Sequence, residues 1–138
     1  MKVLIDTNVI LDVLMKREPH FEFSAQILKL CDTNITGCIT SSQTTDIFYL
    51  LRRFGKDAQS AKDMIKKLTD NVKVLDSNNI DVQNALASSM ADYEDAMLAF
   101  CAKRKKNEYI ITRNEGDFAL SPVPAISPQT FLERLFSN

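Results

Sequence analysis

Three aspartates of this sequence each follow a strand-like, apolar segment. Asp6 ends the run VLI, Asp46 lies in the first turns of the helix expected after a second strand, and Asp117 lies in the turn after YIIT. In a parallel sheet, ligands collect outside the carboxyl ends of the strands, where the loops converge. We therefore expect these three carboxylates to lie at one edge of the sheet.

Two more aspartates, Asp92 and Asp95, stand at the start of a helical pattern that leads into YIIT. They are three residues apart and therefore share one face of the helix, whereas Glu94 is turned away by roughly 100°. Acids at helix N-termini also cap the helix and complement its dipole, which explains any one of them taken alone.

Taken together, these acids require a compensating positive charge, because converging carboxylates repel one another and are costly to bury. The sequence has a single histidine, His20, and no matching cluster of arginines. A divalent cation bound through oxygen is the simplest compensator. Carboxylates with Asn and Thr oxygens suit Mg²⁺ or Mn²⁺ better than zinc.

The composition is that of one globular domain spanning residues 1–138, with 45% hydrophobic and 25% charged residues. The longest apolar runs fall short of the roughly 20 residues that span a bilayer, and no signal-peptide pattern opens the chain, so we expect a cytoplasmic protein without a membrane segment. The three cysteines are expected to be buried thiols. A net charge of −1 excludes nucleic-acid binding driven by bulk charge alone.

Strand-like and helical segments alternate along the chain, which predicts one doubly wound α/β domain. The expected fold is a mainly parallel sheet of four or five strands with helices on both faces, in three layers. Strands are expected at 2–5, 35–40, 72–75, 109–112 and 123–126. Helices are expected at 7–16, 21–30, from Ser41 or Ser42 onward, at 58–69, from Asn78 or Asn79 to 88, at 93–106 and at 128–136.

For two of these helices the sequence also predicts which residues face the hydrophobic core. Ile47, Leu50, Leu51 and Phe54 form the stripe of the helix that begins at Ser41 or Ser42. Met97 and Phe100 are expected to face inward from the helix at 93–106.

Four stretches, in order, carry a resemblance to the PIN domain family, and within it to VapC-type toxins of bacterial toxin–antitoxin pairs. They are LIDTN at 4–8, SSQTTDIFYLLRR at 41–53, EDAMLAFCAK at 94–103 and YIITRNEGDF at 109–118. The resemblance implies a metal-dependent endoribonuclease with Asp6, Asp46, Asp95 and Asp117 around Mg²⁺ or Mn²⁺.

The chain departs from the family pattern at two positions. The second acid is usually a glutamate, so Asp46, one methylene shorter, is expected to reach the metal through water. Many relatives carry an aspartate where this chain has Asn114, which leaves Asp117 as the fourth carboxylate and Asn114 as a supporting ligand. Asp92 is a candidate for a supporting or second-metal residue.

The remaining expected roles concern orientation and RNA. Asn8 and Thr112 are expected to orient their neighbours by hydrogen bonds. Arg113 and Arg53 are the expected RNA contacts, while the KRKK run at 103–106 is assigned to the helix dipole and to solvation. Three further acids are interpreted as structural: Asp12, Asp76 and Asp81.

Two other enzyme classes are excluded and one alternative stays open. An aspartyl phosphatase needs a second acid two residues after the first, where this chain has Asn8, and a phosphate-binding loop needs clustered glycines, of which the chain has only three, all scattered. A catalytically silent PIN fold that binds RNA or a protein partner remains the alternative. The resemblance also implies a homodimer and a small antitoxin partner.

Overall fold

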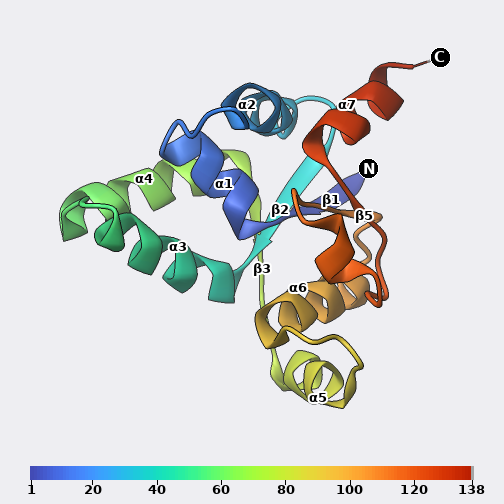
Figure 1. Cartoon of the computed structure of the whole chain (residues 1–138). Helices are drawn as coiled ribbons and strands as arrows, with labels where there is room; N and C mark the ends of the chain where they lie inside the picture. Colours follow the sequence, from blue (N-terminus) through green and yellow to red (C-terminus); the bar gives the residue numbers. More distant parts are fainter. Residues whose placement is uncertain (138) are drawn as a thin grey trace.

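A parallel sheet of five strands runs through the computed structural model, which describes residues 1–137, in the order β3-β2-β1-β4-β5 (Figure 1). The strands are β1 (Lys2–Ile5), β2 (Thr36–Thr40), β3 (Lys73–Leu75), β4 (Tyr109–Ile111) and β5 (Ala125–Ile126). The five-stranded parallel sheet is confirmed. The strand order reverses beside β1, which pairs with β2 on one side and β4 on the other. Such a reversal is the point where α/β sheets bind ligands.

Helices cover both faces of the sheet, as expected. One layer contains α1 (Thr7–Leu14), α2 (Phe21–Leu30), α3 (Ser41–Arg53), α4 (Ala58–Asn71) and α7 (Pro128–Phe136), and the other contains α5 (Asn79–Ala87) and α6 (Tyr93–Arg104) (Figure 1). A short 3₁₀ turn, η1 (Glu115–Phe118), follows β4. None of the helices within residues 1–137 is long and apolar enough to cross a membrane.

The central strand is buried on both faces, which explains its unbroken apolar run. Val3 and Ile5 pack into the core of the larger helical layer, whereas Leu4 packs toward α6, and all three are 0% exposed. Asp6 directly follows the last residue of this strand and therefore lies at the carboxyl edge of the sheet.

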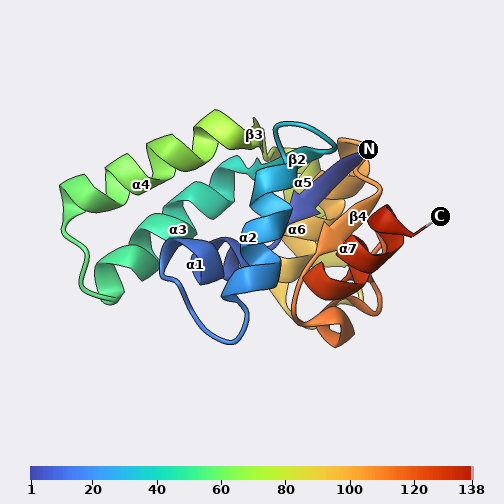
Figure 2. The same ribbon diagram turned by 90° about the horizontal axis from the view of Figure 1, so that it is seen from above.

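The helix α3 differs from the prediction at both ends. Its cap is Thr40, the last residue of β2, because the Thr40 side chain accepts a hydrogen bond from the backbone of Gln43; the expected cap at Ser41 or Ser42 is wrong. Phe54, expected in the inward stripe, is 53% exposed. Leu51 in the last turn of α3 is still buried, but Phe54 follows the end of the helix, where α3 and α4 project beyond the sheet as a hairpin (Figure 2).

The inward face of α6 was also predicted incorrectly. Met97 and Phe100 are only half-buried, and the buried face is formed by Ala96, Leu98 and Ala99. Small side chains on this face allow α6 to lie close to the sheet. The three cysteines are free and buried, as expected.

Candidate functional site

A cleft with a volume of about 600 Å³ opens at the carboxyl edge of the sheet, between the ends of β1, α3, α6 and the loop after β4. Its lining contains all four acids expected at the site, together with Asn8, Asp92 and Asn114. Its acidic residues are Asp6, Asp46, Asp92, Glu94, Asp95 and Asp117. The structure thus brings together carboxylates that are far apart in the chain, such as Asp6 and Asp117, which are 111 positions apart.

Asp6 is the most enclosed of these acids, at 6% exposed. The hydroxyl of Thr112 donates a hydrogen bond of 2.8 Å to its Oδ2, and the same hydroxyl accepts from the backbone N–H of Asn114 at 3.0 Å. Thr112 therefore ties the first acid to the loop that carries the fourth. Its hydrogen bonds are those of an orienting residue.

Gln43 is a further orienting residue that the sequence interpretation overlooked. Its Oε1 accepts a hydrogen bond from the backbone of Thr40 at 2.7 Å, and its Nε2 donates to the carbonyl of Ile5 at 2.8 Å and to the hydroxyl of Thr7 at 3.2 Å. The side chain thus links the start of α3 to the end of β1, and so sets Asp46 relative to Asp6. A Thr followed three residues later by Gln is a capping-box pattern and could have revealed this role.

The start of α6 brings three acids to the cleft. Asp92 is the N-cap, and its Oδ1 accepts a hydrogen bond from the backbone N–H of Asp95 at 3.0 Å, so it performs the ordinary capping function. Glu94 also lines the cleft, although the helical spacing predicted that it would turn away. The reason is that the N-terminus of α6 borders the cleft, so side chains from several directions around the first turn reach it.

The carboxylates influence one another electrostatically. Burial, followed by the charges of Asp92, Asp6, Asp117 and Glu94, raises the pKa of Asp95 to about 7. These contributions require that the acids lie close to one another. The cleft therefore favours protons or cations at neutral pH.

The pKa values of three more of these acids are raised. Burial raises the pKa of Asp6, opposed by the hydrogen bond from Thr112. Burial also raises the pKa of Asp46 on α3, and burial followed by the charges of Asp46, Asp92 and Asp6 raises that of Glu94.

The acids that were interpreted as structural have a different environment. Asp12 is 0% exposed and forms ion pairs with Arg17 at 3.1 Å and Arg113 at 2.8 Å. Asp81 is paired with Arg104 at 2.8 Å, and the exposed Asp76 with Lys105 at 2.9 Å. All three acids thus have a basic partner, which agrees with a structural role.

The two arginines expected to contact RNA lie outside the lining of the cleft. The guanidinium of Arg113 binds Asp12, with Nε donating to Oδ2, so the structure gives this side chain a different partner from the expected phosphate. Arg53 is exposed at the C-terminus of α3. Asp46, Leu50 and Arg53 follow one another at the spacing of a single helix face.

The donor set of the cleft fits a hard divalent cation. Carboxylate, amide and hydroxyl oxygens surround it, and among the described residues its lining contains no cysteine or histidine. Within residues 1–137, however, no three His, Cys, Asp or Glu side chains are close enough together to hold a metal ion as they stand. An ion would therefore have to draw these side chains inward.

Comparisons with known proteins agree with this architecture. The family model described as the PIN domain matches residues 2–116. Ribonuclease VapC1 of Aquifex aeolicus (strain VF5) is 24% identical over 139 residues, covering 96% of this chain and 94% of the relative.

Solved structures show the same fold at low sequence identity. VapBC2 from Rickettsia felis, bound to a DNA fragment from its promoter, superposes with a TM-score of 0.74 at 15% identity, covering 92% of this chain and 98% of that chain. A toxin–antitoxin complex from Klebsiella pneumoniae superposes with a TM-score of 0.70 at 19% identity, covering 91% and 97%.

Proposed function

The chain belongs to the PIN domain family, and we propose that it is a metal-dependent endoribonuclease that hydrolyses RNA phosphodiester bonds. The observation that carries the proposal is the cleft at the switch point of the sheet, where acidic side chains gather without a basic partner among residues 1–137. Repulsion between these carboxylates lowers the stability of the fold, and a bound divalent cation is the simplest way to compensate their charge.

Four carboxylates would hold the ion. Asp6 and Asp95 are the proposed central ligands, since Asp6 is the most enclosed acid of the cleft and the charges of both Asp6 and Asp117 act on Asp95. Asp117 and Asp46 complete the set from η1 and α3. A bound divalent ion supplies an activated water and neutralises charge on the phosphate. Cleavage by water at phosphorus would leave 5′-phosphate and 3′-hydroxyl ends.

The neighbouring side chains have the task of holding these ligands in place. Thr112 fixes one oxygen of Asp6 by its hydrogen bond, and Gln43 fixes the start of α3 relative to β1. Asn8 and Asn114 contribute polar groups to the wall of the cleft, and Leu98 contributes an apolar side chain to the same wall.

The test is an RNA cleavage assay in Mg²⁺ or Mn²⁺, with EDTA as a control, beside thermal unfolding with and without Mn²⁺. Asp6→Asn should abolish cleavage and the stabilisation by Mn²⁺, which follows from binding to the folded state. Asp70→Asn is the matched control, because Asp70 is an exposed residue of α4 outside the cleft, and it should behave as the wild type. If Asp6→Asn cuts RNA at the wild-type rate, the proposal is wrong.

The alternative is a silent PIN fold that binds RNA or protein. The observation that favours it is the short side chain of Asp46 together with the lack of a ready-made metal site among residues 1–137. A silent protein would show neither cleavage nor stabilisation by Mn²⁺ in the same two measurements.

We also propose that a small antitoxin binds this chain and that the chain forms a homodimer. The support for the antitoxin is that similar structures include a toxin–antitoxin complex from Klebsiella pneumoniae and VapBC2 from Rickettsia felis. The dimer rests on the resemblance to VapC-type toxins alone. A protein encoded just upstream that co-purifies with the chain and suppresses its cleavage would support the partner. Sedimentation of the isolated chain as a monomer would contradict the dimer.

A further inference from the structure

Two exposed tyrosines line the same cleft as the carboxylates. Tyr49 on α3 is 78% exposed and Tyr93 at the start of α6 is 46% exposed. Large aromatic side chains this exposed contribute little to the core, and within residues 1–137 neither phenol has a hydrogen-bond partner. The fold does not explain their presence.

The position of Tyr49 connects it to the acids. Asp46, Tyr49, Leu50 and Arg53 lie at the spacing i, i+3, i+4 and i+7, and so form one stripe of α3. The stripe runs from a carboxylate in the cleft, through an aromatic ring, to a cationic side chain about 10 Å further along the helix axis. An RNA strand offers a phosphate that a cation at the carboxylate could hold, an adjacent base for the ring and a further phosphate for the arginine.

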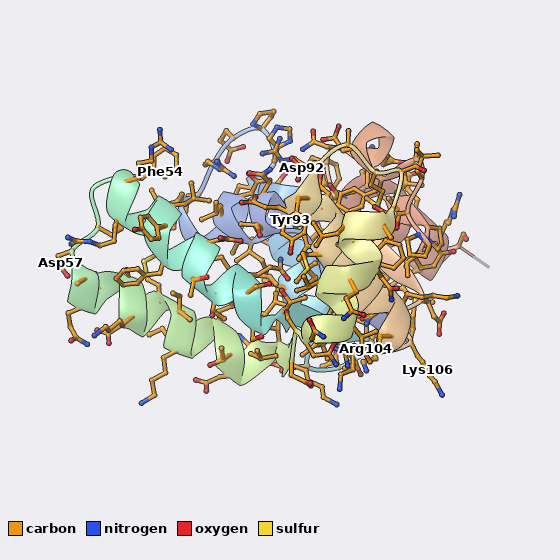
Figure 3. The ribbon with its side chains drawn as sticks, turned by 90° about the horizontal axis from the view of Figure 1, so that it is seen from below. Phe54, Asp57, Asp92, Tyr93, Arg104 and Lys106 are labelled. Atoms are coloured by element: carbon orange, nitrogen blue, oxygen red, sulfur yellow. The ribbon has the colours of Figure 1, made fainter. Side chains whose placement is uncertain are left out.

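Tyr93 lies on the second helix of the cleft. Figure 3 shows Asp92 and Tyr93 together at the end of α6 that borders α3, whereas Phe54 lies at the far end of α3. The apolar side chains of Met97 and Leu98 line the cleft nearby. Two aromatic rings and an apolar surface therefore flank the carboxylates.

We propose that Tyr49 and Tyr93 stack on the nucleobases on either side of the scissile phosphate and so position the strand against the carboxylates. This rests on the proposed ribonuclease function. Aromatic stacking binds bases of any sequence, because every base has a π face. In a duplex the bases stack on one another and are out of reach of a side chain. The tyrosines would thus select for unpaired structure, and they would position the strand rather than react.

Cleavage kinetics on matched substrates test the proposal. Tyr49→Leu and Tyr93→Leu should each lower kcat/KM on a single-stranded oligonucleotide by roughly 10-fold, mainly through KM, because a stacked base is lost. Tyr49→Phe and Tyr93→Phe keep the ring and should cleave as the wild type does. Phe54→Leu is the control, since Phe54 is an exposed aromatic residue of the α3 C-terminus outside the cleft lining.

Substrates that lack a base supply the complementary half of the test. Abasic nucleotides on either side of the scissile phosphate should lower kcat/KM for the wild type as much as the leucine variants do, with little further loss when both changes are combined. A fully paired RNA of the same sequence should be a poor substrate. If the duplex or the abasic strand is cut as fast as the intact single strand, the inference is wrong.

Binding can be measured without cleavage because the chain has no tryptophan and only three tyrosines. The third, Tyr109, packs edge-on against Phe131 at a centroid distance of 6.2 Å, away from the cleft. A non-hydrolysable phosphonate oligonucleotide in Mg²⁺ should therefore quench most of the tyrosine fluorescence of the wild type.

The two readouts separate this inference from the proposed function. Quenching by the phosphonate strand without cleavage of the natural one would contradict the ribonuclease and leave the stacking intact. RNA cleavage that is unchanged in both leucine variants, with no quenching of the wild-type tyrosine fluorescence by the phosphonate strand, would overturn the inference and leave the ribonuclease function standing.

Discussion

The buried and half-buried aspartates of this protein occur in two contrasting settings. Asp12 and Asp81, both 0% exposed, are each paired with arginine. Although burial acts to raise the pKa of Asp81, the hydrogen bonds from Arg104 and the backbone hold it below its ordinary value. Asp6 and Asp95 have no such partner among residues 1–137, and their pKa values are raised. Aspartates paired with arginine thus stabilise the fold, whereas the unpaired aspartates of the cleft lower its stability.

The largest effect on RNA cleavage is expected from removing a carboxylate of the cleft. Asp95→Asn should reduce RNA cleavage below detection, because a proposed central ligand is lost, and should raise the midpoint of thermal unfolding in EDTA, because repulsion is relieved. Cleavage assays and thermal unfolding in EDTA check the two parts. A variant that is inactive and also less stable than the wild type would place Asp95 with the structural acids instead.

The second effect concerns the paired acids. Asp12→Ala should lower the free energy of unfolding by about 3 kcal/mol, the lower end of the range for breaking a buried ion pair, because Arg17 and Arg113 can both reach water. Urea denaturation measures the change, with Asp70→Ala as the exposed control. An unchanged free energy of unfolding would mean that the pairing contributes nothing.

The two settings should also respond to pH with opposite signs. The pKa of Asp95 is raised from 3.8 to about 7, so between these values the unfolded chain loses the proton that the folded chain retains, and stability falls as pH rises. In EDTA, the stability advantage of Asp95→Asn over the wild type should therefore grow from pH 4 to 7. The pKa of Asp81 is lowered, so its contribution is present above 3.8 and is lost as pH falls through the folded value. The cost of Asp81→Asn should be largest at neutral pH.

Thermal unfolding of the wild type and both variants between pH 3 and 8 measures these slopes. Parallel slopes for the two variants would remove the distinction between the settings.

The smallest effect is expected from lengthening one acid. Asp46→Glu should tighten Mn²⁺ binding by up to roughly 10-fold, because the extra methylene lets the carboxylate reach the ion without an intervening water. Calorimetric titration with Mn²⁺ measures the affinity. Weaker binding by Asp46→Glu would indicate that the aspartate already contacts the ion.

Much of the fold follows from local patterns. The unbroken apolar run before Asp6 requires a strand buried on both faces, and the capping residue Asn78 begins α5 as expected. The position of Phe54 did not follow, because helical periodicity gives the direction of a side chain but not whether another element covers it.

The candidate site was predictable in its acids but not in its supporting contacts. The edge of the sheet was known from the order of strands and helices, so Asp6, Asp46 and Asp117 could be placed at it. The pairing of Arg113 with Asp12 joins positions 101 apart, and nothing in the local sequence marks it. Glu94 was missed because a helix that ends at a cleft presents side chains from more than one face.

The parallel sheet separates charge along the molecule. Acids gather where the strands end, whereas Lys2 and Lys73 begin β1 and β3, and the basic end of α6, with Arg104 and Lys106, lies opposite Asp92 (Figure 3). Although the net charge of the chain is only −1, the cleft at the carboxyl edge is therefore locally acidic. Like charges repel, so this edge becomes attractive to a polyanion only once cations have entered the cleft. Metal loading would then set the direction of approach as well as the chemistry.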